Sequence, residues 1–306
     1  MTDSINDRTI NDSNITTLLT GGTGYLGSHL LKRLLKSNQR VILLKRSHSK
    51  TFRIENELQS IQHYDIDKIP LEKVFQENRI DRILHCATHY GRLDKNPIQI
   101  VETNQVFPLQ LLQYAEKYNV QSFINTDTIL DKRVSTYSLS KRQFSEWLEL
   151  YSEKMSCVNV ALEHFYGPGD DRSKFVSFVI MALLENVDKI DLTEGEQRRD
   201  FIYIDDVVEA FLRILESNTA SKPGFYRFEI GTGELISIKD LVLTIQKLSG
   251  STNTLLNFGA IPYRENEIMH PDLNLGPIQK LGWTPRFPLT SGLKNTIDEE
   301  KRNHQL

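Results

Sequence analysis

Short apolar runs alternate with longer stretches of helical periodicity through the first half of the chain. The apolar runs cover 18–20, 40–44, 82–87, 122–125 and 157–162, and a more polar segment, 62–66, predicts one further strand. The helical runs between them cover 28–35, 71–78, about 97–118 and 137–151. Runs this short and this apolar are typical of strands buried on both faces of a parallel sheet. Strands that alternate with helices predict right-handed crossovers and a doubly wound parallel sheet in an α/β fold.

The alternation loosens beyond the sequence Tyr166-Gly167-Pro168-Gly169. We therefore expect three parts: a flexible tail over 1–15, a Rossmann-type dinucleotide-binding domain over 16–165, and a smaller mixed α/β substrate-binding lobe over 166–306. Some segments of the lobe are expected to return to the first domain. No repeat of 20 to 50 residues and no low-complexity linker occurs, which argues against a solenoid or a tethered pair of domains.

A glycine-rich turn separates the first strand from the first helix. Its sequence is Gly21-Gly22-Thr23-Gly24-Tyr25-Leu26-Gly27. A strand that turns through glycines into a helix brings bare N–H groups and the positive end of the helix dipole against a pyrophosphate. Surface turns also collect glycines, but this position favours dinucleotide binding. The predicted contacts are Gly21, Thr23, Gly24, Tyr25, Leu26 and Gly27.

The exit of the second strand carries Lys45-Arg46-Ser47, where an acidic residue would otherwise bind the adenosine ribose. An ammonium and a guanidinium attract a 2′-phosphate, so we expect NADP(H) rather than NAD. The alternative is that both cations only solvate a loop. Asp65 and Ile66, after the next strand, are candidates for the adenine, although a capping or turn role fits Asp65 equally well.

Tyr137 and Lys141 stand four residues apart on a predicted helix, so their side chains share one face. A nearby ammonium would lower the pKa of the tyrosine towards neutrality, as proton transfer at a carbonyl requires. Thr126, after the strand at 122–125, is a candidate donor to the same oxygen. The pattern is common on helix surfaces, but here it follows the glycine turn by about four strand-helix steps.

Composition and charge exclude several other classes of protein. The chain has 306 residues, of which 39% are hydrophobic and 25% charged, and its net charge of -3 gives no general attraction to nucleic acid or to an anionic membrane. The longest apolar run, 176–184, is too short for a bilayer, and residues 1–14 lack the features of a secretory signal. The two cysteines, Cys86 and Cys157, have no metal-ligand spacing. We expect a cytoplasmic enzyme with free thiols and no metal.

Taken together, the motifs resemble those of the extended short-chain dehydrogenases/reductases that modify nucleotide sugars. Besides the glycine turn and the Tyr137/Lys141 pair, the matching segments are His85-Cys86-Ala87-Thr88, Asn104, Thr126, Tyr166-Gly167-Pro168-Gly169, Arg199-Asp200-Phe201, Arg264 and Leu281-Gly282-Trp283-Thr284-Pro285. A narrower set is similar to nucleotide-sugar 4-ketoreductases: Asn125-Thr126-Asp127-Thr128, Leu162-Glu163-His164, Gly195-Glu196-Gln197, Phe258-Gly259-Ala260-Ile261 and Glu265-Asn266-Glu267-Ile268-Met269.

The resemblance implies a reaction and a set of roles. NADPH would deliver hydride to C4 of a nucleotide-linked 4-keto-deoxysugar, Tyr137 would protonate the alkoxide, Lys141 would hold the nicotinamide ribose, and Thr126 would bind the ketone oxygen. Further cofactor contacts implied by the family are Ala87, Thr88 and Asn104, and the implied substrate contacts are Thr126, Asp127, His164, Arg199 and Arg264. The reaction favoured is reduction of CDP-4-keto-3,6-dideoxyglucose to CDP-abequose for O-antigen, lipopolysaccharide or other cell-surface polysaccharide.

Two departures from the family pattern stand out. Only 10 residues separate Thr126 from Tyr137, and His164 occupies a place where many relatives carry asparagine. His164 therefore fits a structural role as well as a substrate contact.

Several alternatives stay open at this point. They are reduction of dTDP-4-keto-6-deoxyglucose, a nucleotide-sugar 4-epimerase, a 4,6-dehydratase, and a silent dinucleotide-binding regulatory subunit. Dehydratases place an Asp-Glu pair after the threonine, whereas here Thr128 follows Asp127. A homodimer is expected through the helix at 137–151, with Phe144, Trp147, Leu148 and Tyr151, although an ordinary core-packing face is an equal alternative.

Overall fold

The computed structural model describes residues 15–92, 94–265 and 267–304 of the chain. The predicted tail over 1–15 therefore lies outside the described residues, apart from Ile15. All the predicted strands and helices lie within the described residues.

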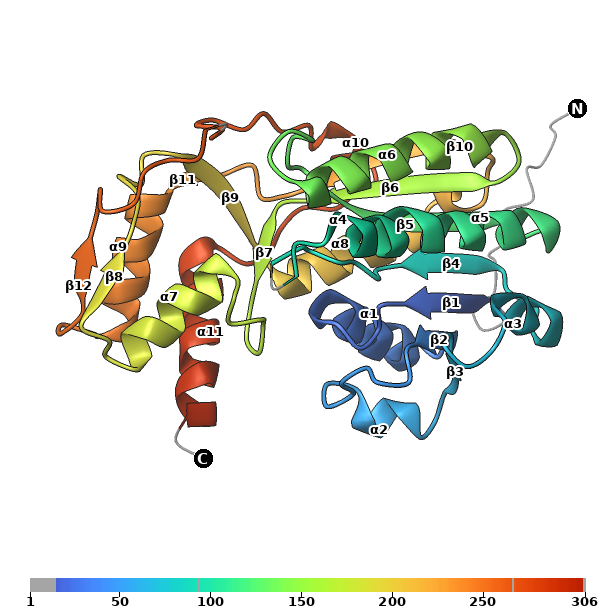
Figure 1. Cartoon of the computed structure of the whole chain (residues 1–306), viewed down its shortest axis with the longest axis horizontal. Coiled ribbons are helices and arrows are strands. Elements are labelled where there is room, and N and C mark those ends of the chain that lie inside the picture. Colours follow the sequence, from blue (N-terminus) through green and yellow to red (C-terminus); the bar gives the residue numbers. More distant parts are fainter. Residues whose placement is uncertain (1–14, 93, 266, 305–306) are drawn as a thin grey trace, which may run out of the picture.

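A seven-stranded parallel sheet forms the larger part of the molecule (Figure 1). Its strands, in spatial order, are β10 (Gly224–Ile230), β6 (Ser156–Leu162), β5 (Ser122–Thr128), β4 (Arg82–His85), β1 (Thr16–Thr20), β2 (Arg40–Lys45) and β3 (Gln62–Asp65). Every neighbouring pair is parallel. The order reverses between β1 and β4, which creates the switch point at which doubly wound sheets bind ligands. The predicted doubly wound sheet is confirmed.

Both faces of this sheet are buried because each central strand carries apolar side chains at odd and even positions. Leu18 joins the hydrophobic cluster on one face and Leu19 the cluster on the other, and both are 0% exposed. The first face is covered by α3 (Leu71–Glu77), α5 (Phe107–Lys117) and α6 (Thr136–Leu150). The second is covered by α1 (Tyr25–Lys36) and α8 (Ile204–Glu216). Alternation of cluster membership along β1 is what the pleat of a strand requires.

The predicted helix at 97–118 is interrupted. It consists of α4 (Pro97–Val101), a π-helical turn (Glu102–Val106) and α5. Pro108 has no N–H to donate to the carbonyl of Asn104, so an unbroken α-helix is not possible here. The wider turn ends where the Phe107 N–H donates to the Glu102 carbonyl.

The second lobe lies at the carboxyl end of the sheet (Figure 1). A three-stranded sheet holds β11 (Leu235–Ser237), β9 (Arg198–Tyr203) and β7 (His164–Tyr166), and a two-stranded one holds β12 (Leu255–Asn257) and β8 (Lys189–Asp191). Its main helices are α7 (Phe175–Leu184), α9 (Ile238–Ser249) and α11 (Leu289–His304). Two short helices complete the fold, α2 (Glu55–Leu58) in the first part and α10 (Gly276–Gln279) in the second.

The chain crosses between the two parts more than once. After β9 it returns through α8, which packs on α1, and then through β10, which pairs with β6 at the edge of the large sheet. The division at residue 165 stays a prediction, but β10 and α8 lie on the large sheet although they follow that point.

The helix proposed for dimerisation divides its apolar residues between two faces. Phe144 and Leu148 are 0% exposed and belong to the core under the sheet, whereas Trp147 is 45% exposed and Leu150 is 67% exposed. Core packing therefore accounts for the first two side chains, and the outer face of α6 carries the other two.

Asp206 ties the Leu281-Gly282-Trp283-Thr284-Pro285 segment to α8. Its carboxylate accepts hydrogen bonds from the N–H groups of Arg286 (2.9 Å) and Phe287 (3.0 Å), and its backbone carbonyl accepts one from Trp283 Nε1 (3.2 Å). Asp206 is only 2% exposed, so its carboxylate is bound within the protein rather than by bulk water.

We expect Asp206→Ala to lower the free energy of unfolding by about 1–3 kcal/mol, because two part-buried hydrogen bonds to backbone N–H groups lose their acceptor. Urea unfolding followed by circular dichroism measures the change. Asp205→Ala is the matched control, since Asp205 is the exposed neighbour in the same turn. Equal destabilisation by both substitutions would contradict the assigned role of Asp206.

Candidate active site

The glycine turn is formed by backbone contacts that leave no room for side chains. Gly21 has φ +71°, and a Cβ there would lie 2.5 Å from the Ala87 nitrogen. A Cβ on Gly27 would lie 2.1 Å from the Gly21 carbonyl oxygen, and the Gly24 N–H donates to the same oxygen at 3.0 Å. The turn thus needs glycine to bring β1, α1 and the end of β4 together.

The backbone N–H groups in the first turn of α1 have no side-chain cap. Gly24 caps the helix without any side-chain hydrogen bond. Tyr25 and Leu26 turn their side chains into the core, so their backbone is what they offer to a ligand. Thr23 lies partly exposed in the turn itself. An uncapped helix start beside a backbone cradle fits the pyrophosphate of a dinucleotide.

Lys45 and Arg46, the two cations expected to bind the 2′-phosphate, have different surroundings in the structure. Lys45 is ion-paired with Asp65, and this hydrogen bond lowers the pKa of the Asp65 carboxyl. The neighbouring parallel strand thus supplies a counter-charge to Lys45, and the role of Lys45 at the 2′-phosphate stays a prediction. Arg46 stays exposed at the end of β2. Ile66 extends the β2–β3 pairing by donating its N–H to the Lys45 carbonyl at 2.9 Å.

The Tyr137/Lys141 pair lies on α6, which begins with a capping box between Ser135 and Ser138. Lys141 is 1% exposed, and its Nζ has no hydrogen-bond partner among the described residues. The ring of Tyr137 lies 5.1 Å from that of Tyr90, centroid to centroid. A buried ammonium with unused donors fits the ribose hydroxyls of a dinucleotide.

The pKa of Tyr137 differs from the sequence-based expectation. It is raised well above the ordinary value, first by burial and then by the neighbouring Tyr90 and Asp127, while a hydrogen bond from Thr128 opposes the rise. Burial likewise lowers the pKa of Lys141, against the pull of Asp127. The prediction of a tyrosine pKa lowered towards neutrality is wrong here, because burial penalises the phenolate.

The side chains of the three residues after Asn125 form hydrogen bonds with different groups. The Thr126 hydroxyl donates to the His85 carbonyl at 3.1 Å, so its proton is already engaged. Asp127 is 8% exposed and its carboxylate is bound within the protein. Thr128, not Thr126, is the hydroxyl bonded to Tyr137.

The predicted cofactor contacts that follow β4 lie between β1 and α6. The Ala87 N–H donates to Thr20 Oγ1 at 3.3 Å, and Thr88 lies partly exposed beside it. Asn104 is 0% exposed and lies in the π-helical turn. Its amide holds both the N–H (2.8 Å) and the carbonyl (3.0 Å) of His89, and it donates to Ser140 Oγ at 2.9 Å. The Asn104 side chain thus fixes the 87–92 loop on α6.

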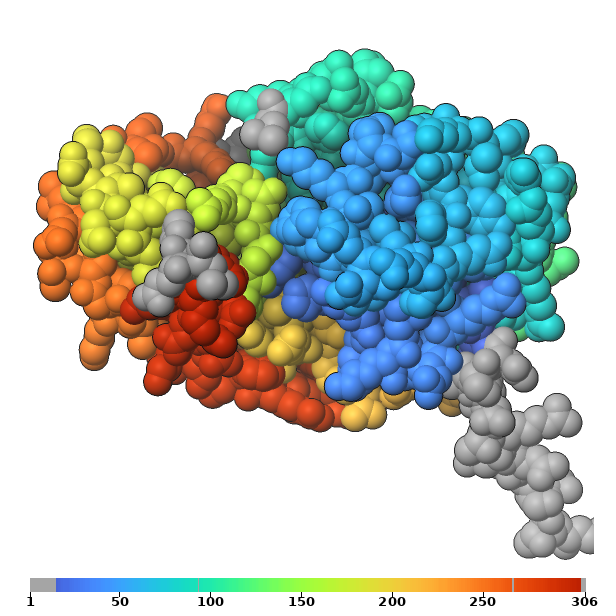
Figure 2. Space-filling model, turned by 90° about the horizontal axis from the view of Figure 1, so that it is seen from below, coloured from blue at the N-terminus to red at the C-terminus, as the bar shows by residue number. Residues whose placement is uncertain are grey.

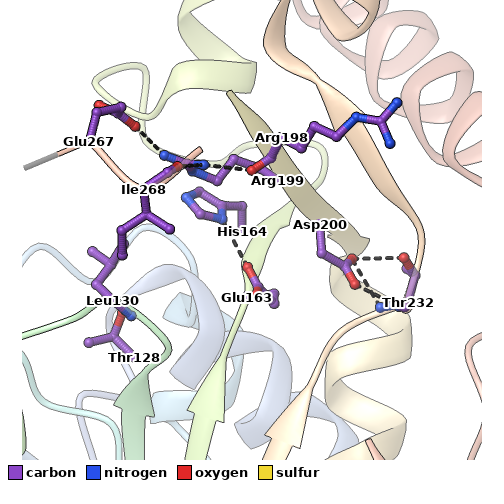
Figure 3. A network of polar contacts seen from close by, with 11 residues as sticks. Thr128, Leu130, Glu163, His164, Arg198, Arg199, Asp200, Thr232, Glu267 and Ile268 are labelled. Atoms are coloured by element: carbon purple, nitrogen blue, oxygen red, sulfur yellow. Dashed lines mark hydrogen bonds and ion pairs between the residues drawn. The ribbon is translucent and has the colours of Figure 1, made fainter. Parts of the chain in front are cut away.

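Of the substrate residues expected from the second lobe, Figure 3 shows His164 and Arg199 close together. The Arg199 guanidinium is ion-paired with Glu267 and donates to the carbonyls of Arg198 (2.5 Å) and Ile268 (2.6 Å). The exposed Arg264 acts on Arg199 through its charge. His164 faces the buried Glu163 carboxylate, with Nδ1 and Oε2 3.1 Å apart.

Two cavities open on the described part of the chain. One, of about 470 Å³, is lined by Arg53, Asp170 and Met181. Figure 2 shows a face of the molecule on which the blue segments of the first part meet the yellow and red segments of the second lobe. Arg53 joins the first part of the chain to the second lobe by donating a hydrogen bond to the Gly169 carbonyl at 2.9 Å. The other, of about 410 Å³, is lined by Thr128 and Ile268 and reaches α6 at Ser138. It connects the end of β5 with the segment that holds Arg199.

Three residues that contact Tyr137 or α6 are not among the candidates of the sequence analysis. Tyr90 gave no signal beyond its place after a strand, and Thr128 stands there only as part of the Asn125-Thr126-Asp127-Thr128 segment and in the place of a dehydratase glutamate. Asn159 had a signal, since it is an amide in the middle of an apolar strand, and it is 0% exposed. Among the described residues, no group of three or more His, Cys, Asp and Glu side chains could hold a metal ion. The described helices include none that is long and apolar enough to cross a membrane.

The chain is similar over most of its length to several enzymes whose names refer to nucleotide sugars. A CDP-abequose synthase of Salmonella typhimurium (strain LT2) is 35% identical over 291 residues, covering 92% of this chain and 96% of its own. Human dTDP-D-glucose 4,6-dehydratase is 27% identical over 318 residues, covering 94% and 90%. The crystal structure of UDP-glucose 4-epimerase from Thermotoga maritima, with UDP-glucose, matches with a TM-score of 0.82 at 24% identity, covering 95% and 100%.

The family model described as the NAD dependent epimerase/dehydratase family matches residues 17–231. This span runs from β1 to the end of β10 and so includes the glycine turn and the Tyr137/Lys141 pair. The expected resemblance is thereby confirmed: the chain belongs to the NAD-dependent epimerase/dehydratase family of extended short-chain dehydrogenases/reductases.

Proposed function

We propose that the protein reduces the C4 ketone of a nucleotide-linked 4-keto-deoxysugar with NADPH. The favoured reaction is CDP-4-keto-3,6-dideoxyglucose to CDP-abequose, and the product would serve cell-surface polysaccharide synthesis. The observation that carries the proposal is a protonated phenol, Tyr137, one turn from a buried ammonium, Lys141, on α6. Identity of 35% with a CDP-abequose synthase supports the choice of substrate.

The chain offers a proton at the place where the ketone oxygen would lie. Bound NADPH would supply the hydride that the carbonyl carbon receives. Tyr137 holds its proton at neutral pH and can give it to the oxygen as negative charge develops there. Thr128 keeps a hydrogen bond on the Tyr137 oxygen and so stabilises the phenolate that is left. Lys141 would orient the nicotinamide ribose through its unused donors.

Arg199 and Arg264 would bind the diphosphate of the substrate. A guanidinium binds two phosphate oxygens at once. Arg199 is now bound by Glu267, so the diphosphate would take the place of that carboxylate. Glu267 would in that way hold Arg199 in its binding orientation before the substrate arrives. His164 would lie beside the substrate, oriented by Glu163.

NADPH is favoured over NADH by Arg46. Lys45 is neutralised by Asp65, whereas Arg46 is exposed at the carboxyl end of β2 and can reach a 2′-phosphate. In this proposal the discrimination between NADPH and NADH would rest on the Arg46 guanidinium rather than on Lys45 and Arg46 together.

Reduction is preferred to the other reactions of the family for two reasons. Elimination of water needs a free acid and a base, but both Asp127 oxygens accept hydrogen bonds within the protein and Thr128 cannot act as a base at neutral pH. An epimerase retains its NAD, whereas Arg46 favours a phosphorylated cofactor that arrives and leaves. A silent regulatory subunit would not need the Tyr137/Lys141 pair.

A homodimer would bury the outer face of α6 and its neighbour α4. Ile98 (63% exposed), Leu139 (41%), Trp147 (45%) and Leu150 (67%) lie on these two helices. The helices contact each other, so their exposed apolar side chains belong to one side of the molecule. A second copy that presents the same face would cover them.

We expect Tyr137→Phe to reduce turnover at least about 100-fold, because the ketone oxygen loses its proton donor. The assay follows the absorbance of NADPH with CDP-4-keto-3,6-dideoxyglucose, with the dTDP-4-keto-6-deoxyglucose substrate in parallel. NADPH binding by the variant, measured by fluorescence, should stay unchanged and serves as the control for folding. Unaltered turnover in the variant would refute the proposal.

Arg46→Ala should weaken NADPH binding roughly tenfold and leave NADH binding unchanged, because only NADPH carries the 2′-phosphate. Isothermal titration calorimetry gives both affinities. Arg40→Ala, an exposed cation at the opposite end of β2, is the control and should affect neither cofactor. A parallel loss for NADPH and NADH would argue against phosphate recognition by Arg46.

Trp147→Glu should convert the dimer to a monomer, since a charge cannot be buried without a partner. Size-exclusion chromatography with light scattering reports the mass. Phe178→Glu, on the exposed face of α7 and 46% exposed, is the matched control and should leave the dimer intact. A monomeric unaltered protein at micromolar concentration would contradict the proposed contact.

A further inference from the structure

The loop after β4, residues 87–92, is held on both sides of Tyr90. Asn104 accepts a hydrogen bond from the His89 N–H at 2.8 Å and donates one to the His89 carbonyl at 3.0 Å. The Gly91 N–H donates to His89 Nδ1 at 3.1 Å. Gly91 has φ +66°, and a Cβ there would lie 2.9 Å from Ile100 Cδ1, so the turn favours glycine. These contacts fix the backbone that carries the Tyr90 side chain.

The Tyr90 ring contacts Tyr137 on α6 and Arg92 in its own loop. The centroids of the two tyrosine rings lie 5.1 Å apart, and their planes meet at 44°. The Arg92 Cζ lies 4.9 Å from the Tyr90 centroid. The Arg92 guanidinium also donates to Ser173 Oγ, just before α7 of the second lobe, at 3.3 Å. Tyr90 is 40% exposed, so part of its ring stays open beside the ring of Tyr137.

The two threonine hydroxyls at the end of β5 already form hydrogen bonds within the protein. Thr126 Oγ1 donates to the His85 carbonyl at 3.1 Å. Thr128 Oγ1 is bonded to Tyr137 and accepts the Leu130 N–H at 3.3 Å. A sugar hydroxyl placed against these groups would compete with bonds that the protein makes, whereas a CH₂ or CH₃ group needs no partner.

A 3,6-dideoxy sugar presents apolar groups on both sides of C4. C3 is a CH₂ group, and C5 carries a methyl group in place of a hydroxymethyl group. In the proposed function Tyr137 gives its proton to the oxygen on C4, so the groups that flank C4 lie close to the neighbouring Tyr90 ring. A hydroxyl covered by an aromatic ring loses its water without gaining a hydrogen bond, whereas an apolar group gains free energy by burial there.

We propose that Tyr90 is a specificity-determining residue, whose ring forms an apolar wall beside Tyr137 and selects sugars without hydroxyls at C3 and C6. This inference rests on the proposed function, because proton donation by Tyr137 is what puts C4 of the sugar beside Tyr90. It names the side chain that distinguishes a dideoxy sugar from a fully hydroxylated one.

The sugar preference can be measured without any reduction. With NADPH bound, isothermal titration calorimetry gives the affinities of CDP-3,6-dideoxyglucose and CDP-glucose, which differ only in the hydroxyls at C3 and C6 and carry no ketone. We expect the unaltered protein to bind the dideoxy sugar at least about tenfold more tightly. Tyr90→Asn should bring this ratio of affinities to about one, whereas Tyr90→Phe should keep it, because the ring remains.

Phe178→Asn is the matched control, since Phe178 is an aromatic residue of similar exposure (46%) on α7. It should leave the ratio of affinities unchanged. The affinity for NADPH reports the folding of each variant, and Tyr90→Ser replaces Tyr90→Asn where that variant does not bind NADPH. A ratio near one in the unaltered protein, an unchanged ratio in Tyr90→Asn, or a ratio lost in Tyr90→Phe would each overturn the proposal.

A second readout separates this inference from the proposed function. The absorbance of NADPH with CDP-4-keto-3,6-dideoxyglucose reports whether the ketone is reduced. A protein that prefers the dideoxy sugar through Tyr90 but oxidises no NADPH refutes the reduction and leaves the apolar wall standing. A protein that reduces the ketone but binds both sugars equally refutes the apolar wall alone.

Discussion

The requirement that a parallel sheet be covered on both faces governs the arrangement of this molecule. The central strands carry apolar side chains on both sides, as Leu18 and Leu19 do in β1, so helices must return across each face in turn. Parallel strands joined in this way all end at one edge. The glycine turn follows β1, the Ala87 loop follows β4 and Thr128 ends β5, and all three meet at that edge. The candidate site residues lie at this edge because the loops that follow the parallel strands all begin there.

The second constraint is the cost of burying charge in that edge. Lys141 is buried without a hydrogen bond of its own among the described residues, and Asp127 supplies an opposite charge across the α6–β5 contact. The same solution recurs at the seam between the lobes, where buried Asp170 is ion-paired with Lys174 at 3.0 Å, and Lys174 lies 3.7 Å from the Phe165 ring centroid. A buried ion loses hydration and keeps its charge only with a nearby partner. The Asp170–Lys174 pair lies at the start of α7.

The second lobe is held to the first by hydrogen bonds from backbone groups to buried carboxylates. Asp200 accepts the N–H groups of Thr232 (3.0 Å) and Gly233 (2.6 Å), which joins β9 to the turn after β10. Asp206 does the same for the segment before α11. Arg199, next to Asp200 on β9, is carried by this frame to the place where Figure 3 shows it bound to Glu267. A side chain expected to bind diphosphate is thereby presented from a rigid strand.

The sequence by itself determined the periodicities, and with them the sheet, its order of strands and helices, the glycine turn and the pairing of Tyr137 with Lys141 on one helical face. These are local properties, set by spacing along the chain. The tertiary structure alone decided which groups meet across strands: Asp65 with Lys45, Asn159 with Asp127, Glu267 with Arg199, and Thr128 rather than Thr126 with Tyr137. It also decided that burial raises the pKa of Tyr137. Register between strands and the loss of water around a side chain depend on segments far apart in the chain, so no local pattern carries them.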